Sequence, residues 1–137
     1  MTTIARRFSW DAAHRVTRHE SKCRNLHGHR YEAEVVVRGP LDPLGRVVDF
    51  SVLKDRVGGW LDATWDHGAL LAVHDAALLA LVQVNDWRHY VLDGEPTAEN
   101  LARELLARAR SLLSDTGIEV VSVRVWETAN CWAEESA

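Results

Sequence analysis

The stretch CRNLHGH, residues 23–29, brings one thiol and two imidazoles together at the start of a segment rich in β-formers. His27 and His29 are two residues apart, so on a β-strand both side chains project to the same side. Two imidazoles placed in this way can reach one metal ion at about 2.0–2.1 Å. Gly28 lies between them and allows a tight backbone conformation. The stretch therefore predicts a metal site at the mouth of a strand.

A zinc site needs at least one more ligand, and His14 ends an earlier segment with the alternation of a strand. Neighbouring antiparallel strands would bring His14 to His27 and His29. Three neutral imidazoles leave one zinc position open, as catalytic sites do. Cys23 lies four residues before His27 and, by spacing alone, could equally close the site as a fourth ligand. The spacing leaves both alternatives open: an open catalytic site, or a closed structural site in a binding module.

Two further motifs contain acids that a closed structural site does not need. Asp66 and His67 are adjacent in WDHGAL, and on a helix such neighbours do not face each other, so the pair alone is typical of a helix end. Glu127 shares strand parity with three valines of EVVSVRVWET, which places its carboxylate on the apolar face. A carboxylate there must be paired or accept N–H donors, for example from a planar heterocyclic ligand. These acids favour the open, catalytic alternative.

Three other histidines, His19, His74 and His89, have no such companions and are interpreted as surface or loop residues. The chain has 137 residues and a net charge of −4, with no block of lysine or arginine. This composition suits a single domain, residues 1–137, and argues against nucleic acid or an anionic membrane as a partner. No signal peptide or membrane-spanning run is recognised, and two distant cysteines suggest a reducing compartment. We expect a cytoplasmic protein.

The periodicity of the chain indicates an α+β fold that would position these residues. Strands are expected over residues 3–14 and 29–38, in IEVVSVRVWET, and in the short partner CWAEE. Helices are expected in DFSVLKDRVGGWLD, capped by Asp49 or Ser51, in AVHDAALLALVQV, and in PTAENLARELLARARSLLSDTG, capped by Thr97. RHYVLDGEP is expected to be extended or loop. This order predicts a four-stranded antiparallel sheet with two main helices on one face.

The motifs occur in an order that resembles the 6-pyruvoyltetrahydropterin synthase and 6-carboxytetrahydropterin synthase family. The markers are Phe8 and the AAH ending at His14, Cys23 followed after three residues by HGH, the DF at residues 49–50, the DH ending at His67, the PTAEN ending at Asn100, and the ET ending at Thr128. They span nearly the whole chain. The three-residue interval between Cys23 and His27 is similar to that of the 6-carboxytetrahydropterin synthases of the queuosine and deazapurine route.

The resemblance implies a role for each matching residue of the first motifs. His14, His27 and His29 match the zinc ligands. Cys23 matches the catalytic thiol, which would stand near the metal without binding it.

The later motifs imply the remaining roles. Asp66 and His67 match the residues that accompany the thiol in proton transfer. Glu127 matches the carboxylate that anchors the pterin ring through its 2-amino and N3 edge and also joins the proton relay. Thr128 and Thr97 lie in matching motifs and are implied to help bind the ring.

The implied fold is the tunnelling fold, in which subunits join their sheets into a barrel, trimers commonly stack into hexamers, and active sites lie between subunits. The implied reaction converts 7,8-dihydroneopterin triphosphate to 6-carboxytetrahydropterin, acetaldehyde and triphosphate with Zn²⁺ as the cofactor. Two alternatives are a 6-pyruvoyltetrahydropterin synthase that only eliminates triphosphate, and a zinc- and pterin-binding module without turnover. The chain departs from the family pattern at Leu71, where Asn is frequent, and over residues 68–95, which contain an additional apolar run.

Overall fold

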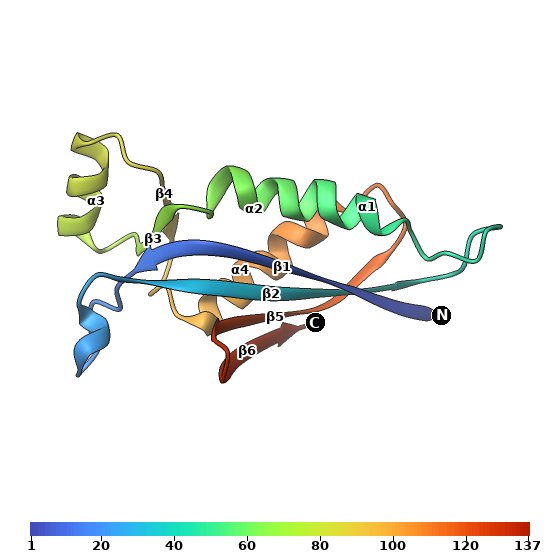
Figure 1. Ribbon diagram of the computed structural model, residues 1–137, viewed down its shortest axis with the longest axis horizontal. Coiled ribbons are helices and arrows are strands. Elements are labelled where there is room, and N and C mark those ends of the chain that lie inside the picture. The colour runs from blue at the N-terminus through green and yellow to red at the C-terminus, as the bar shows by residue number, and fades with distance from the viewer.

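Two long strands, β1 and β2, form the middle of one curved sheet in the computed structural model, which describes residues 1–137 (Figure 1). They pair antiparallel along their whole lengths, from Thr2 opposite Gly39 to His14 opposite His27. Alternate residues of both strands face the core, where Trp10 stacks on Tyr31 at 5.5 Å between ring centroids. The strands are β1 (Thr2–His14), β2 (His27–Gly39), β3 (Gly68–Ala72), β4 (His89–Leu92), β5 (Glu119–Thr128) and β6 (Cys131–Ser136), in the order β4-β3-β1-β2-β5-β6.

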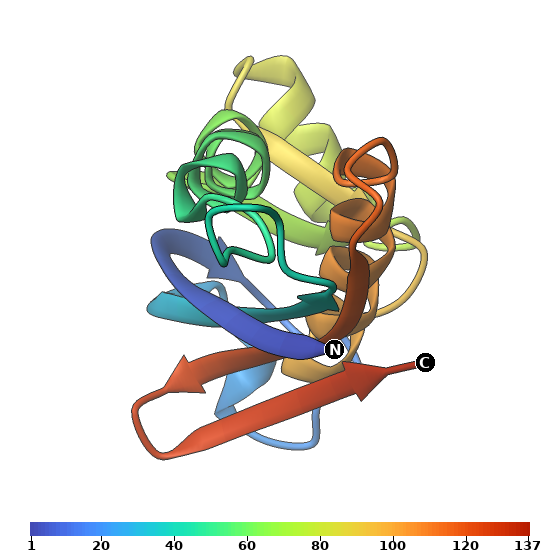
Figure 2. The same ribbon diagram turned by 90° about the vertical axis from the view of Figure 1, so that its right-hand side faces the viewer.

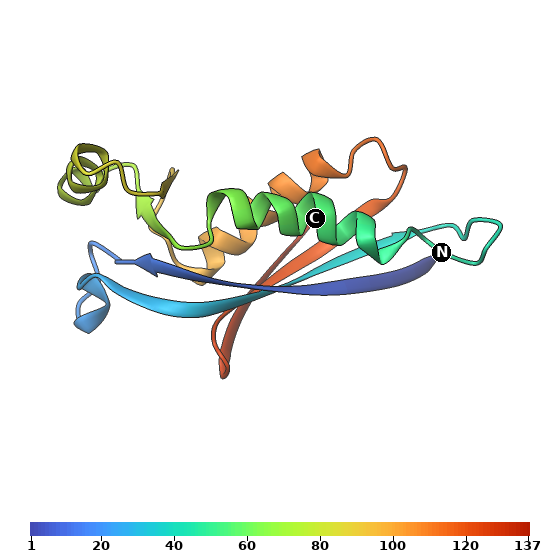
Figure 3. The same cartoon turned by 45° about the horizontal axis from the view of Figure 1, so that its top comes forward.

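Helices cover one face of this sheet (Figures 2 and 3). α1 (Phe50–Leu53) and α2 (Gly59–Thr64) are joined by the π-helical turn Lys54–Gly58 into one helical stretch, and α4 (Ala98–Leu112) packs beside β5. Asp49 caps α1 by accepting a hydrogen bond from Ser51 N, and Thr97 caps α4 by accepting one from Asn100 N. Gly58 permits close packing, because a Cβ there would lie 3.3 Å from the Phe8 ring. No helix is both long enough and apolar enough to cross a membrane.

The prediction of a four-stranded antiparallel sheet is wrong, because the sheet has six strands and is mixed. β1, β2, β5 and β6 pair antiparallel as expected, whereas β3 pairs parallel with β1, and β4 parallel with β3. β3 has five residues, four of them buried, so it lacks the alternation that marks a half-exposed strand. The two added strands and a third helix, α3 (Ala76–Val84), all come from residues 68–95.

Candidate metal centre and active site

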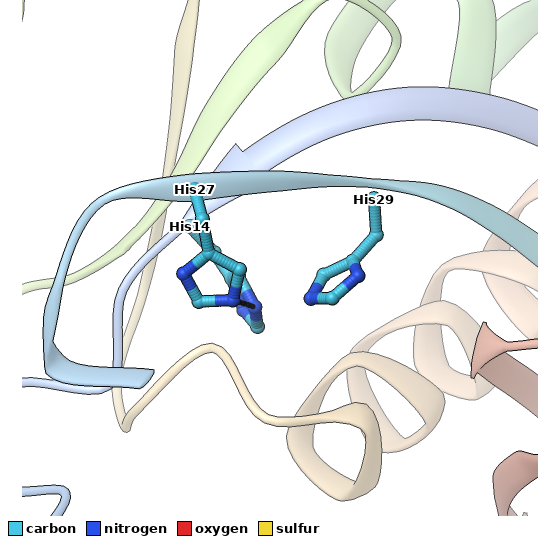
Figure 4. A group of neighbouring side chains, drawn as sticks. All are labelled: His14, His27 and His29. Atoms are coloured by element: carbon cyan, nitrogen blue, oxygen red, sulfur yellow. Dashed lines mark hydrogen bonds between the residues drawn. The ribbon is translucent and has the colours of Figure 1, made fainter. Parts of the chain in front are cut away.

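Three histidines meet where β1 ends and β2 begins. His14 pairs with His27 across the ladder, and His29 lies opposite Ala12, so one face of the hairpin carries all three rings. Their ligand atoms lie within 4.8 Å of one another, and Figure 4 shows the rings converging from the two strands. His14 is buried, and the other two are half-buried. The structure therefore brings together the three residues that the HGH motif and the end of the first strand indicated.

Backbone carbonyls orient two of the rings. His14 Nδ1 lies 2.7 Å from Pro96 O, and His27 Nδ1 lies 2.7 Å from Asn25 O. A carbonyl can only accept, so both Nδ1 atoms carry the proton and both Nε2 atoms present a lone pair. These two Nε2 atoms are 3.2 Å apart, and His29 Nε2 is buried without a hydrogen-bond partner. Converging lone pairs of this kind repel unless a cation lies between them, so the three residues fit a metal ion.

Glu127 completes the centre from the end of β5. Its Oε1 lies 3.0 Å from His14 Nε2 and 3.4 Å from His29 Nε2. A hydrogen bond from His14, which requires a proton on Nε2 as well as on Nδ1, holds the pKa of Glu127 below its ordinary value against the opposing effect of burial, and a cation bound by the neutral ring would favour the ionised carboxylate in the same way. Burial in turn lowers the pKa of His29, which favours the neutral imidazole that a metal binds. The carboxylate on the apolar face of β5 is thus paired, as its position required, and it adds negative charge to a cation site.

Cys23 lies in a short 3₁₀ turn, Lys22–Arg24, within the loop that joins His14 at the end of β1 to His27 at the start of β2, and is half-buried. The group of ligand atoms within 4.8 Å contains three histidines and no cysteine. This geometry fits the open alternative better than a closed site with a fourth sulfur ligand. Both cysteines of the chain are free.

Asp66 and His67 form a second cluster at the junction of α2 and β3. His67 has φ +58°, outside any helix, and this conformation lets its Nδ1 contact Asp66 Oδ2 at 2.9 Å. The pair does follow the end of α2, and the left-handed conformation of His67 turns the two neighbouring side chains toward each other, which adjacent residues within a helix cannot do. β1 holds both, because Asp11 N donates to Asp66 Oδ1 at 3.0 Å and Asp11 O accepts from His67 N at 2.6 Å. The hydrogen bond from Asp11 lowers the pKa of Asp66.

The two clusters share no ligand atoms within the chain. His67 groups with Asp11 and Asp66, not with the three histidines, and its side chain is 76 % exposed. It lines a cavity of about 740 Å³ that Arg30, Trp87 and one of the three histidines, His29, also line. The structure thus keeps the pair with implied proton-transfer roles at the surface.

The two threonines differ in their surroundings. Thr128 ends β5 and borders a cavity of about 690 Å³ that Glu127, His29 and Arg7 also line. Thr97 Oγ1 accepts from Asn100 N at 3.2 Å as the cap of α4, so its hydroxyl has a structural partner.

His74 is an exposed residue in a turn, as expected, but it has hydrogen-bond partners that the sequence did not indicate. Its Nε2 lies 3.1 Å from Glu95 Oε1 and 3.2 Å from Thr17 Oγ1. Sequence reasoning also missed Pro96, whose carbonyl orients His14. No local pattern signals these contacts, because they join loops 21 or more residues apart.

Comparison with known proteins agrees with this geometry. The family described as 6-pyruvoyl tetrahydropterin synthase matches residues 3–137. Proteins named 6-carboxy-5,6,7,8-tetrahydropterin synthase are 36 % identical in Rickettsia bellii (98 % of this chain, 99 % of that protein) and 32 % identical in Haemophilus influenzae (98 % of both). The structure of Caenorhabditis elegans 6-pyruvoyl tetrahydropterin synthase is 27 % identical with a TM-score of 0.74, covering 99 % of this chain and 95 % of that one. The chain belongs to the 6-pyruvoyl tetrahydropterin synthase family.

Proposed function

We propose that the protein is a zinc-dependent 6-carboxy-5,6,7,8-tetrahydropterin synthase. It would convert 7,8-dihydroneopterin triphosphate and water to 6-carboxytetrahydropterin, acetaldehyde and triphosphate. The observation that carries this proposal is the convergence of three imidazole Nε2 atoms beside the Glu127 carboxylate. The 6-carboxytetrahydropterin synthases named above, which match almost the full length of this chain, support the choice of product.

His14, His27 and His29 would hold the zinc ion. Zinc with three neutral imidazole ligands keeps an open position and supplies Lewis-acid activation of the substrate's side-chain hydroxyls. Two of the imidazole rings are already oriented for metal binding, because Pro96 O and Asn25 O each accept a hydrogen bond from one ring. Such outer contacts also fix which nitrogen faces the metal.

Glu127 and Thr128 would bind the pterin ring. They border the 690 Å³ cavity that also reaches His29, so a ring held there would carry its side chain toward the metal centre. The lowered pKa of Glu127 keeps its carboxylate ionised, and an ionised carboxylate accepts two parallel N–H bonds from the 2-amino and N3 edge. Thr97 caps α4, and its contribution to binding of the pterin ring would be indirect, through the position of the start of that helix.

Cys23 and His67 would move protons. A thiolate is the reactive form of cysteine and can take a proton from the substrate side chain. His67 would exchange the next proton, with its Nδ1 oriented by Asp66 at 2.9 Å. Because His67 faces outward in its own chain, we propose that it acts in the site of a neighbouring subunit.

An assembly of the tunnelling type would make this contact. β4 and β6 are the two outer strands, so each has one side of its ladder without a partner. Joining these edges between copies of this single-domain chain would close a barrel of trimers, which could stack into hexamers. The exposed His67 and its surrounding cavity are then completed by a second copy.

The deciding experiment incubates zinc-loaded, reduced protein with 7,8-dihydroneopterin triphosphate and measures acetaldehyde together with the pterin products. Acetaldehyde that appears in step with 6-carboxytetrahydropterin supports the proposal. Triphosphate release without acetaldehyde would instead assign the 6-pyruvoyl reaction named by the family description. Pterin binding without any turnover would leave a binding module. Cys23→Ala protein is the control for uncatalysed decay of the substrate.

A further inference from the structure

The side chain of Glu95 is a junction between three loops near the metal centre. Its Oε2 accepts from Thr17 N at 3.0 Å, and its Oε1 accepts from Thr17 Oγ1. His74 Nε2 lies 3.1 Å from the same Oε1. Glu95 is largely buried, with 18 % of its side chain exposed, so it is held by donors on both oxygens. The loops that meet are those after β1, after β3 and before α4.

The loop after β1 carries Cys23, and its fold transmits this junction to the thiol. Val16 N donates to Cys23 O at 2.9 Å across the loop, one residue before the Thr17 that Glu95 binds. His19 N donates to Val16 O at 3.0 Å, and this hydrogen bond closes a turn within the same loop. Because Val16, the neighbour of Thr17, is hydrogen-bonded to Cys23, a carboxylate that holds Thr17 in place also restrains the part of the loop that contains Cys23.

Glu95 is itself anchored to the element that orients His14. Its backbone oxygen accepts from Thr97 N at 2.8 Å and from Asn100 Nδ2 at 2.8 Å, which ties it to the first turn of α4. The next residue, Pro96, supplies the carbonyl for His14 Nδ1. The segment Glu95–Pro96 thus contacts the metal centre through the Pro96 carbonyl. It contacts the loop after β1 that carries Cys23, the thiol loop, through the Glu95 side chain.

We propose that Glu95 is a positioning residue that sets the Cys23 thiol relative to the metal centre, acting through Thr17. The inference rests on the proposed function in giving Cys23 a chemical role. Proton transfer in an enzyme depends steeply on the distance between base and substrate, and a misplacement of about 1 Å can cost roughly a hundredfold in rate. A rigid link between thiol loop and metal centre is what such a distance requires.

The primary test is Glu95→Gln, which keeps the size of the side chain but replaces one acceptor oxygen with an amide donor. In a Cys131→Ser background, Cys23 is the sole thiol, and its modification by a bulky maleimide reports its exposure without any turnover. We expect modification to become several-fold faster, and kcat to fall about tenfold to a hundredfold with KM changed less than about twofold. Bound zinc should stay at the wild-type level, because Pro96 contacts His14 through its backbone.

The matched control is Glu104→Gln, the same substitution at another partly buried carboxylate. Glu104 accepts hydrogen bonds from Tyr90 Oη and Arg108, in a contact that does not include the thiol loop. A general loss of rigidity would raise maleimide modification in both variants, whereas a positioning role raises it in Glu95→Gln alone.

Thr17→Val provides a second variant that removes one donor and preserves the shape of the side chain. It should reproduce the direction of the Glu95→Gln effects, and the double variant should be no worse than Glu95→Gln alone, since both act on one contact. Unchanged thiol modification and unchanged kcat in both variants would overturn the proposal. If the protein has no synthase activity, the maleimide rates still decide the positional part, so the two failures are distinguishable.

Discussion

The three-histidine centre and the cluster of Asp11, Asp66 and His67 differ in how far a single chain completes them. The three-histidine centre lies within one hairpin, has two of its rings oriented by backbone carbonyls, and contains a buried Nε2 without a hydrogen-bond partner. His67 is oriented by Asp66 alone and has most of its side chain in solvent. The first cluster has its imidazoles positioned for a metal within one chain. The second presents an exposed imidazole that is positioned to contact a group outside its own chain.

The physical cause of the difference lies in the backbone. A fully paired ladder places His14 opposite His27 and leaves no freedom in their separation. His67 lies at a junction with a positive φ, where its side chain is turned outward and its N donates to Asp11 O, while Asp11 N donates to Asp66 Oδ1. Buried, preorganised ligands suit metal binding, and an exposed acid–base pair suits a shared site.

The largest effect is expected when the prepared centre loses a ligand. In His29→Ala, metal affinity should fall by more than the roughly 10–100-fold that loss of an outer-shell partner costs, and turnover should vanish. Zinc content after dialysis, measured by elemental mass spectrometry, checks this. His89→Ala is the control, since His89 contacts only the carbonyl of Trp87 and should keep its zinc. Full zinc retention in His29→Ala would contradict the assignment of the centre.

A large effect on rate, without loss of metal, is expected for Cys23→Ala. Removing a general base should lower kcat by about 10²–10⁴-fold, and zinc should remain bound because the sulfur is outside the ligand group. Parallel measurement of kcat and zinc content distinguishes the two roles. Zinc lost together with the sulfur would assign Cys23 as a fourth ligand and close the site.

His67→Ala tests whether the exposed cluster serves another subunit. The variant should lose about 10²-fold in kcat and keep its zinc. If sites are shared between subunits, co-refolding it with Cys23→Ala protein should restore up to about a quarter of wild-type activity by random assortment. Recovery of both variants through an affinity tag carried by only one of them confirms that mixed oligomers form. Mixed oligomers without recovered activity would place each site within one chain.

The smallest effect is expected when the ion pair between Arg15, the residue after His14, and Asp75 is removed. Arg15 Nε lies 2.7 Å from Asp75 Oδ2, and this carboxylate is almost fully buried. Burial raises the pKa of Asp75, but the hydrogen bonds from Arg15 and Leu78 N offset it and hold the pKa below 3.8. The stabilisation is therefore complete above about pH 4 and is lost as the pH falls through the lower folded value.

Asp75→Asn should lower the free energy of unfolding by about 2 kcal/mol at neutral pH and flatten this acid loss. Urea titrations at pH 7 and pH 3 measure both quantities. An acid loss of the same size in the variant would show that other carboxylates cause it. Zinc affinity should change little, because Asp75 does not contact the three histidines.

The two long strands and the cluster of three histidines could be predicted because their signals are local. Alternation over residues 3–14 and 29–38 marks two half-buried strands, and HGH places two ligands on one face. Once two such strands pair antiparallel, the end of one lies beside the start of the other, so His14 follows from the hairpin. The cap Thr97 was likewise predicted from residue type and position, and Asp49 is one of the two caps predicted for the first helix.

Tertiary structure alone decided the remaining features, because each depends on a contact between distant segments. β3 is short and almost wholly buried, and β4 has only four residues, so neither shows the alternation that reveals a strand. The contact of Asp66 with His67 needs a left-handed backbone that β1 stabilises, and no residue type announces it. Glu95, Thr17 and His74 meet only because the parallel addition of β3 and β4 to β1 brings three loops to the same end of the sheet. Periodicity encodes which face of an element is buried, whereas the packing of the elements decides which side chains meet.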